Sequence, residues 1–498
     1  MGYKDLREFV DRLSENGELV KVKAEVNWDR EIGAITRKVL NNKGKALLFE
    51  NIKGYKNTPC TKFITNTLGS RKRVCLALGL KEDTPYGEIT RSMKDRFTKR
   101  VDPIKVETGH VKENIVRGEE VNLFKFPVPK WHHLDGGRYI NTLVGVVTMD
   151  PDTKVMNIGT YRGMISSKSG ISVLLAASQH WGMHFAKYRA MNKPMPVACV
   201  YGWDTALFIT ASTPLQHPGC SEYEIAGALR GEPVELVKCE TSDLYVPAWA
   251  EIVVEGFISP DPKTFEMEGP FGEYPGYYGG MVSPKPKIKV ECITHRNNPI
   301  LIGALEGTSP GKWAESAHVC SAGYSAVAWN FLETVGVPNI LDVWSPPVAY
   351  PTNMRVKIRK IYRGQAKQVA NALWASSIAN YTAKNVIVVD EDIDIHDDEA
   401  IEWAIAYRVN PDMNDVVFFP GTIGSMLDPS VPLPVRNASK YGQGKWCRTL
   451  IDATKNWELE REEQYGGELY PPLATDIDPE DEKLIGKRWE EYGIEPVK

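Results

Sequence analysis

The chain has 498 residues, of which 42% are hydrophobic and 25% charged, a composition typical of a soluble globular protein with two to four domains. Its 60 Lys and Arg against 64 Asp and Glu give a formal net charge of -4, which disfavours nucleic acid or an anionic membrane as a partner. The sequence contains no basic leader and no apolar run of membrane-spanning length, so we expect a cytoplasmic protein. Its eight cysteines form no CxxC pair and are interpreted as reduced thiols.

The first 120 residues are predicted to form an α+β domain. Helical patterns cover 5–15 and 30–41, and strand patterns cover 17–26 and 46–52. From residue 121 the pattern changes to short β-branched runs separated by Pro and Gly, which include YINTLVGVVTM, MPVACVYG, AEIVVEGFI, KIKVECITH and ILIGALEG. This pattern predicts a β-rich domain over 121–307, with its sheet curled into a barrel.

The last predicted domain, 308–498, alternates helix and strand patterns. Apolar residues recur at helical spacing over 321–336 and 365–378, and a buried-strand run with an acidic end follows at 385–395. This alternation indicates an α/β unit with a parallel or mixed sheet. A charged helical stretch at 478–493 is interpreted as a packing arm or dimerisation segment.

Three polar side chains in separate motifs could form a metal site. They are Asn157 in NIGTYRGMI, His180 in SQHWGMHF and Glu222 in SEYEIAGALRG, where Ser221 is expected to cap a helix. Together they would provide nitrogen and oxygen ligands for a hard or borderline divalent ion, with Mn²⁺ or Mg²⁺ favoured. Their spacing matches no standard metal motif, and a buried or surface histidine without a ligand role is the ordinary alternative.

The segment EGPFGEYPGYYGG places Glu268 and Glu273 on a turn that cannot be helical. If both carboxylates point to one side, coupling would raise one pKa and create a proton donor. Arg162 could keep the other carboxylate ionised through a bidentate ion pair. The alternative is that both acids lie on a solvated turn.

His318, in SPGKWAESAHVC, follows the β-rich domain at a boundary where a cleft would fall. It is either a substrate contact or an ordinary helix residue. The acids in VIVVDEDIDIHDDEA are interpreted as a solvated strand end that leads into a helix cap.

In this order, NIGTYRGMI, SQHW, SEYEIAGALRG, EGPFGEYPGYYGG and KNVIVVDEDIDI resemble the UbiD family of reversible decarboxylases, in layout its ferulic acid and aromatic acid branch. The resemblance covers nearly the whole chain. It implies a central split β-barrel of the flavin-reductase-like kind and a homodimer or larger homo-oligomer.

The resemblance also implies a cofactor, prenylated FMN, which a flavin prenyltransferase supplies and whose phosphate binds through a divalent metal, usually manganese. It assigns Asn157, His180 and Glu222 as metal ligands. A monovalent cation such as K⁺ is expected at the backbone of Ala211 and Ser212. The remaining flavin contacts implied by the resemblance are Gln179, Pro214 and Lys384.

The family's catalytic Glu-Arg-Glu network corresponds to Glu268, Arg162 and Glu273, with Glu273 as the acid that protonates carbon after carbon dioxide leaves. The implied substrate is an aryl or acrylic acid, and a polar residue at His318 favours an aromatic or heteroaromatic acid over cinnamate. Two other classes stay open. One is a manganese-dependent hydrolase or oxygenase without flavin, and the other is a non-catalytic flavin-binding module.

Overall fold

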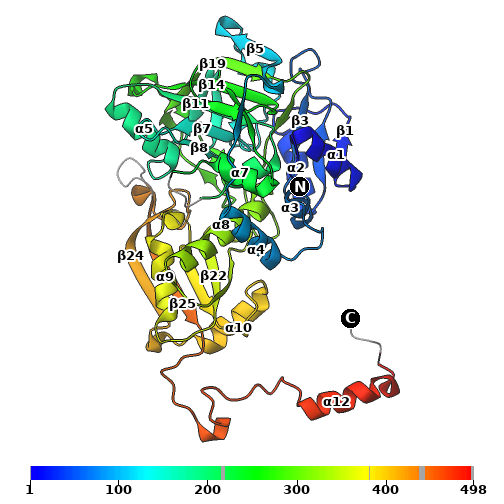
Figure 1. Ribbon diagram of the computed structural model, residues 1–498, viewed down its shortest axis with the longest axis vertical. Coiled ribbons are helices and arrows are strands. Elements are labelled where there is room, and N and C mark those ends of the chain that lie inside the picture. Colours follow the sequence, from blue (N-terminus) through cyan, green and yellow to red (C-terminus); the bar gives the residue numbers. More distant parts are fainter. Residues whose placement is uncertain (1, 215–218, 381, 437–443, 495–498) are drawn as a thin grey trace. The chain divides into compact units, whose positions relative to one another are not determined.

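The computed structural model describes residues 2–214, 219–380, 382–436 and 444–494, which include every predicted site residue. The chain forms two compact units, Met1–Ala453 and Thr454–Lys498 (Figure 1). The first unit contains three principal sheets, and all predicted site residues belong to it.

The N-terminal part begins with the predicted amphipathic helix. Helix α1 (Leu6–Glu15) buries Leu6, Phe9, Val10 and Leu13, which recur at the spacing of one helical face. The side chain of Asp5 caps this helix, because its carboxylate accepts a hydrogen bond from the Glu8 backbone N–H at 3.0 Å. The other helices of this part are α2 (Glu31–Asn41), α3 (Arg71–Leu78) and α4 (Tyr86–Phe97).

A four-stranded sheet in the order β1-β2-β3-β20 completes the N-terminal part. Its strands are β1 (Leu19–Val22), β2 (Ala46–Phe49), β3 (Lys62–Thr65) and β20 (Ile300–Ile302). We predicted ILIGALEG as a strand of the β-rich domain, but β20 pairs in parallel with β3 instead. A parallel partner far away in sequence leaves no local signature, because nothing in the strand itself specifies which sheet it joins.

The central part is a curled antiparallel sheet whose main path runs β6-β9-β10-β19-β14-β11-β7-β8, with β5 paired to β19. Figure 1 shows β19, β14, β11, β7 and β8 side by side in this order. The bounds are β5 (Asn114–Arg117), β6 (Tyr139–Asn141), β7 (Gly145–Met149), β8 (Met156–Gly159), β9 (Gly163–Ser167), β10 (Gly170–Val173), β11 (Met195–Tyr201), β14 (Ile252–Ile258) and β19 (Lys287–His295). The predicted β-rich domain with a curled sheet is confirmed, whereas a flavin-reductase-like split barrel stays a prediction.

Helices and short strand pairs surround this sheet. The helices are α5 (His180–Ala190), α6 (Thr205–Ala211) and α7 (Glu222–Arg230), and a three-stranded sheet contains β13 (Tyr245–Pro247), β12 (Glu235–Lys238) and β4 (Ile104–Val106). Two consecutive antiparallel pairs shape residues 266–285 into one long hairpin. They are β15 (Glu266–Glu268) with β18 (Ser283–Lys285), and β16 (Phe271–Gly272) with β17 (Tyr278–Gly279).

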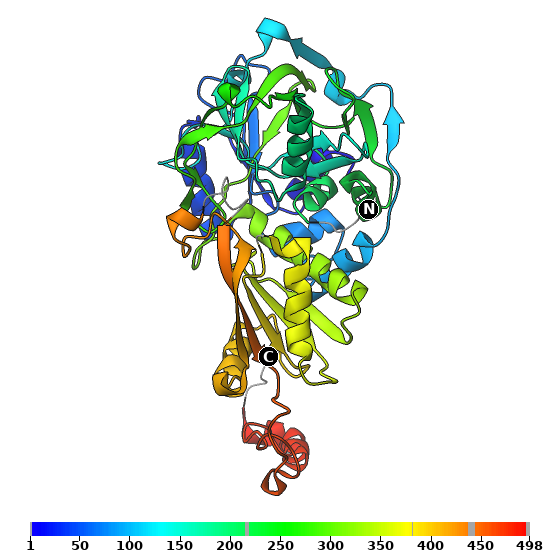
Figure 2. The ribbon, with the colours of Figure 1, turned by 90° about the vertical axis from the view of Figure 1, so that its left-hand side faces the viewer.

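The C-terminal part of the first unit is a mixed five-stranded sheet in the order β21-β22-β23-β25-β24, in agreement with the predicted alternation of helices and strands, whereas the domain bounds 308–498 stay a prediction. Its elements are β21 (Ile340–Trp344), β22 (Asn353–Ile358), β23 (Asn385–Val389), β24 (Val416–Gly424), β25 (Gly444–Ala453), α8 (Glu315–Thr334), α9 (Gln365–Ala375) and α10 (Asp398–Arg408). Val386 and Val388 of β23 pack with α8 and α9, whereas Ile387 and Val389 pack with α10. Helices therefore cover both faces of the sheet, as Figure 2 shows with α9 in yellow and α10 in gold.

The second unit contains the predicted charged helix. Helix α12 (Pro479–Arg488) is capped by Asp478, whose side chain accepts a hydrogen bond from the Glu480 backbone N–H at 2.8 Å. Acidic residues occupy its first turn and basic residues its last turn, an arrangement in which these charges interact favourably with the helix dipole.

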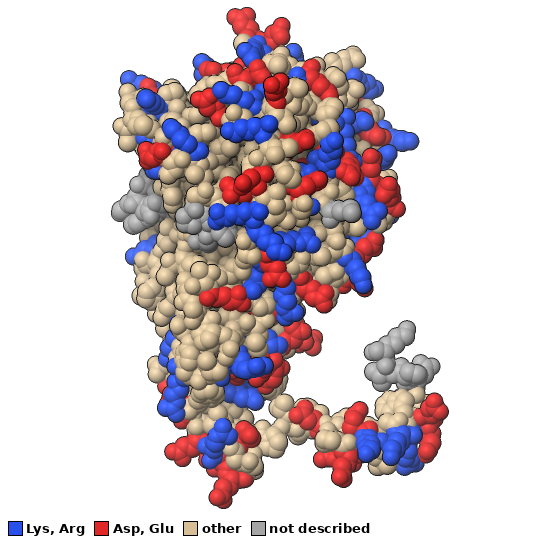
Figure 3. Space-filling model, viewed as in Figure 1, with Lys and Arg blue, Asp and Glu red and all other residues tan. Residues whose placement is uncertain are grey.

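Basic and acidic side chains are interspersed on the face in Figure 3, in agreement with the nearly balanced charge of the chain. Among the described residues, no helix is both long and apolar enough to cross a membrane.

Candidate active site

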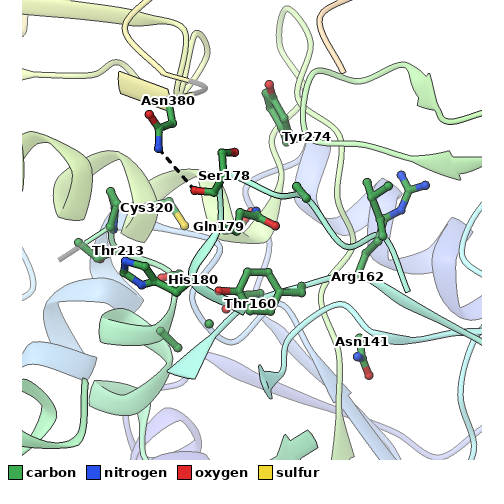
Figure 4. Close-up of a pocket in the computed structure, with 18 of the residues that line it drawn as sticks. Asn141, Thr160, Arg162, Ser178, Gln179, His180, Thr213, Tyr274, Cys320 and Asn380 are labelled. Carbon is green, nitrogen blue, oxygen red and sulfur yellow. Dashed lines mark hydrogen bonds between the residues drawn. The ribbon is translucent and has the colours of Figure 1, made fainter. Parts of the chain in front are cut away.

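A cavity of about 300 Å³ lies in the first unit, where the central sheet, α8 and segments of the C-terminal part meet. Figure 4 shows residues that contribute to its wall, among them Asn141, Cys320 and Asn380. The Asn380 side chain donates a 3.5 Å hydrogen bond to the backbone oxygen of Ser178, which links the C-terminal part to the loop before α5. The wall therefore depends on segments about two hundred residues apart in the sequence.

Arg162 joins the two glutamates of the long hairpin. It immediately precedes β9, and its Nη2 donates to Glu268 Oε2 at 2.8 Å while its Nη1 donates to Glu273 Oε1. Tyr139 in β6 donates its hydroxyl hydrogen bond to the other oxygen of Glu268 at 2.7 Å. Glu268 is fully buried, whereas Arg162 and Glu273 line the cavity. The expectation that both carboxylates point to one side and meet Arg162 agrees with this geometry.

The environment of Glu273 favours its protonated form. Burial raises the pKa of Glu273, Arg162 opposes this rise, and the negative charge of Glu268 adds to it. Burial alone would lower the pKa of Arg162, but Glu273 and Glu268 raise it above its ordinary value, so the guanidinium stays charged. The cluster thus combines a guanidinium that stays charged with one carboxyl group whose pKa lies above its ordinary value.

Glycines in the returning strand allow this close packing. A Cβ at Gly280 would lie 2.7 Å from Arg162 Nη2, and one at Gly279 would lie 2.6 Å from Glu273 Cγ. Gly280 also has a φ of +76°, which side-chain-bearing residues rarely adopt. Any larger residue here would displace the Arg162 and Glu273 side chains.

The predicted metal ligands lie together at another part of the same cavity. His180 begins α5, and its Nδ1 lies 2.7 Å from the side-chain oxygen of Asn157 in β8. Glu222 begins α7 and accepts a hydrogen bond from the backbone N–H of Ile158, the neighbour of Asn157, at 2.8 Å. As predicted, Ser221 caps α7.

The electrostatics of these three residues suit a bound cation. Burial raises the pKa of Glu222 to about 7. This shift reflects poor solvation of the negative charge, and a divalent ion would reverse it by pairing with the carboxylate. No cluster of three His, Cys, Asp or Glu able to hold a metal occurs among the described residues, so the amide of Asn157 would have to be the third ligand.

The residues predicted to contact the flavin divide into two groups. Gln179, Ala211, Ser212 and Pro214 line the cavity. Lys384 does not belong to this lining in the described chain, since its Nζ binds Asp428 at 2.8 Å and Ser430 at 2.7 Å. A phosphate contact of Lys384 therefore stays a prediction without support from the cavity.

The structure places His318 outside the lining of this cavity, among aromatic rings. Its ring stacks on Trp313 with centroids 5.5 Å apart, and its Nδ1 contacts the hydroxyl of Tyr86. The face of α8 that lines the cavity instead carries Ser316, Cys320 and Tyr324. Two residues correspond to about 200° of helical rotation, so a side chain two positions from Ser316 or Cys320 points away. A substrate contact of His318 therefore stays a prediction without support from the cavity lining.

Sequence reasoning missed several residues of the cavity wall. Glu306 precedes α8, and Tyr350 precedes β22. Tyr350 is recognisable from its position beside a proline, but nothing local to Glu306 marks it as a cavity residue.

Three family models match consecutive parts of the chain. They describe the N-terminal, Rift-related and C-terminal domains of 3-octaprenyl-4-hydroxybenzoate carboxy-lyase, and they match residues 10–93, 103–309 and 317–453. The fold and these matches define a carboxy-lyase built from three parts. The chain belongs to the UbiD family, which confirms the resemblance seen in its motifs.

Similar proteins include one with a named activity and one without. The phenolic acid decarboxylase of Sedimentibacter hydroxybenzoicus is 34% identical, over 95% of this chain and 96% of that protein. An uncharacterized protein of Archaeoglobus fulgidus is also 34% identical, over 99% of both chains.

Solved structures agree over nearly the full length. The closed form of vanillic acid decarboxylase from S. hydroxybenzoicus superposes with a TM-score of 0.86 at 32% identity, covering 99% of both chains. The UbiD-class enzyme HmfF of Pelotomaculum thermopropionicum, in complex with FMN, has a TM-score of 0.77 at 30% identity, covering 96% of this chain and 99% of that chain.

Proposed function

We propose that this chain is a prenylated-FMN-dependent carboxy-lyase that reversibly decarboxylates an aromatic, heteroaromatic or α,β-unsaturated carboxylic acid. The observation that carries the proposal is Arg162 bound to both Glu268 and Glu273 at the wall of a cavity. Family membership supports it, as do a phenolic acid decarboxylase and a structure of HmfF with prenylated FMN among the similar proteins.

When bound, prenylated FMN supplies a sink for the electron pair that carbon dioxide leaves behind. Glu273 then protonates the carbon that lost the carboxyl group, because its buried carboxyl tends to hold a proton and lines the cavity. Arg162 orients Glu273 through their hydrogen bond, and after the proton has moved to carbon its guanidinium forms an ion pair with the Glu273 carboxylate that is left. Glu268, held by Tyr139 and Arg162, fixes the guanidinium in place.

The cofactor would be held at the other part of the cavity. Asn157, His180 and Glu222 would bind a divalent ion, Mn²⁺ in the first place, and this ion would neutralise the flavin phosphate beside the Glu222 carboxylate. The backbone of Ala211 and Ser212 is the proposed site of a monovalent cation such as K⁺. A flavin prenyltransferase would supply the cofactor, and the predicted domain boundaries and homo-oligomer remain part of the proposal.

The test compares chain produced with and without a flavin prenyltransferase. Protein produced together with the prenyltransferase should show flavin absorbance at wavelengths longer than the protein absorbance band. It should also release carbon dioxide from members of a panel of aryl, heteroaryl and acrylic acids. In deuterium oxide, deuterium should appear at the carbon that carried the carboxyl group. Metal-dependent turnover without flavin absorbance would instead support a hydrolase or oxygenase, and bound flavin without carbon dioxide release would support a binding module.

A further inference from the structure

One carboxylate in the cavity wall has no role in the proton transfer described above. Glu306 lies between β20 and α8, and both of its side-chain oxygens accept from the Ser316 hydroxyl at 3.0 Å. In the described part of the chain, Ser316 is the one group that donates to this side chain. Arg37 is close, but it donates to the backbone oxygens of Glu306 and Trp313 instead.

A second buried glutamate nearby shows what a fully paired carboxylate looks like. Glu315, at the start of α8, accepts hydrogen bonds from the backbone N–H groups of Asn66, Thr67 and Leu68 and from the hydroxyls of Thr65 and Thr67. A carboxylate offers about four acceptor positions. Those of Glu315 are occupied, and this residue does not line the cavity, whereas Glu306 lines it and has capacity left.

Glu306 also lies in a segment that runs beside the proposed proton donor. The backbone N–H of Thr308 donates to the Tyr274 oxygen at 2.9 Å, and a Cβ on Gly307 would lie 3.6 Å from the backbone oxygen of Glu273. The charge of Glu273 adds to the effect of burial, which raises the pKa of Glu306 to about 7. A ligand whose reacting carbon is near Glu273 can therefore reach Glu306 with a substituent.

The wall around these carboxylates is aromatic. The Tyr350 ring lies 5.3 Å from that of Tyr324 and 6.4 Å from that of Tyr274, with interplanar angles of 71° and 61°. Such rings provide edges and faces against which a planar aryl group packs. An ionised Glu306 would repel a second carboxylate on the ligand, whereas a neutral hydroxyl would supply the missing donor.

On the basis of the proposed function, we infer that Glu306, oriented by Ser316, accepts a hydrogen bond from a hydroxyl group on the ring of the substrate. Glu306 is then a specificity-determining residue, and the preferred substrates are hydroxylated aromatic acids. A methoxy group cannot donate a hydrogen bond, so the methyl ether of each hydroxylated acid is the matched control substrate.

The test measures kcat/KM of the cofactor-loaded enzyme for 4-hydroxybenzoate and 4-methoxybenzoate, and for the 3-substituted pair. For the pair that places its hydroxyl at Glu306, Glu306→Leu should lower the hydroxy-to-methoxy ratio on the order of 10- to 100-fold, the scale of a lost hydrogen bond to a charged group. Ser316→Ala and Glu306→Gln should lower it less. Cys320→Ala changes the same face of α8 but keeps the carboxylate, so it should leave the ratio unchanged.

A binding measurement separates this inference from the proposed function. Dissociation constants of phenol and anisole, measured by calorimetry on the same proteins, need no turnover, and wild type should prefer phenol while Glu306→Leu should not. If wild type releases no carbon dioxide from any acid, the proposed function fails while the binding data still test Glu306. Equal losses for hydroxy and methoxy acids, or an unchanged ratio in Glu306→Leu, would overturn the inference.

Discussion

Two buried arginines in this protein each join a pair of carboxylates, and they differ in what surrounds them. Arg162 binds Glu268 and Glu273 beside the cavity. Arg296 binds Asp5 at 2.6 Å and Glu251 at 3.3 Å, away from the cavity lining. The residue types and their burial are alike, so the comparison isolates the effect of position.

Around Arg296 the donors saturate the carboxylate. Glu251 accepts from Arg7 Nε at 2.8 Å, from Arg7 Nη2 at 3.0 Å and from the backbone N–H of Ile300 at 2.9 Å, in addition to Arg296. These bonds tie α1 to β14 and β20. Around Arg162, by contrast, Glu273 lines the cavity. The difference teaches that a buried carboxylate whose acceptor positions are filled by the surrounding chain ties segments of the fold together, whereas one that lines a cavity is available for chemistry.

The largest effect is expected for a substitution in the Arg162 cluster, which lines the cavity. Glu273→Gln keeps the size and position of the side chain but removes the transferable proton, so turnover should fall 10²-fold or more, the usual contribution of a general acid. Carbon dioxide release by the cofactor-loaded variant measures the loss, with melting temperature and flavin content as controls. Retention of more than about a tenth of the wild-type rate would contradict Glu273 as the main proton donor.

On the structural side, Glu251→Ala should lower the free energy of unfolding by about 1–3 kcal/mol. The change leaves Arg7 without its carboxylate partner and the backbone N–H of Ile300 without its acceptor, while Arg296 keeps only Asp5. Denaturant titration of wild type and variant measures the difference. Correctly folded Glu251→Ala at permissive temperature should keep its turnover per bound flavin. A large loss of kcat with normal stability would contradict the conclusion that the Arg296 cluster serves stability and the Arg162 cluster serves catalysis.

The predicted metal ligands Asn157, His180 and Glu222 form a third polar cluster, which can be tested in the same way. His180→Ala should yield folded protein that loses divalent metal and flavin together, because the ion would connect the protein to the flavin phosphate. The matched control is His184→Ala, one turn along α5, where the ring contacts Thr148 at 3.0 Å and does not line the cavity. Elemental analysis and absorbance on the same samples give both contents. Full cofactor occupancy in His180→Ala would place the metal elsewhere.

The smallest expected effect concerns His318, a buried ionisable group outside both clusters. Burial lowers its pKa from 6.5 to about 4, so the unfolded chain binds a proton below pH 6.5 that the folded chain does not. This contribution to stability is complete above pH 6.5 and declines as the pH falls towards 4, by roughly 2 kcal/mol at pH 5. His318→Phe keeps an aromatic ring and should remove that part of the pH dependence. Parallel curves of stability against pH for the two proteins would show that the pKa of His318 is not lowered in the folded protein.

The motifs of the chain predicted that Glu268, Arg162 and Glu273 lie together, and the structure brings the three side chains into contact, while their catalytic role stays a proposal. Glu268 and Glu273 are separated by Gly-Pro-Phe-Gly, which restricts the backbone to a turn, and this restriction acts within a few residues. The contact with Arg162 was offered from the residues only as one possible ion pair, and the resemblance in motif order made it a definite expectation, because no local rule relates residues more than a hundred positions apart. The same limit applies to His318, because the sequence gives no information on how the helix that carries it is rotated relative to the cavity.

What the sequence determined by itself is therefore local and compositional. The cap at Asp5, the apolar face of α1, the cap at Ser221 and the strands of the central sheet follow from interactions within a few residues, which the chain specifies directly. Only the tertiary structure decided that β20 joins the N-terminal sheet, that Ser316 rather than His318 lines the cavity, and that Glu306 lies beside Glu273. Each of these depends on contacts between distant segments, and the free energy of such contacts is set by the packing of the whole first unit rather than by any single stretch of chain.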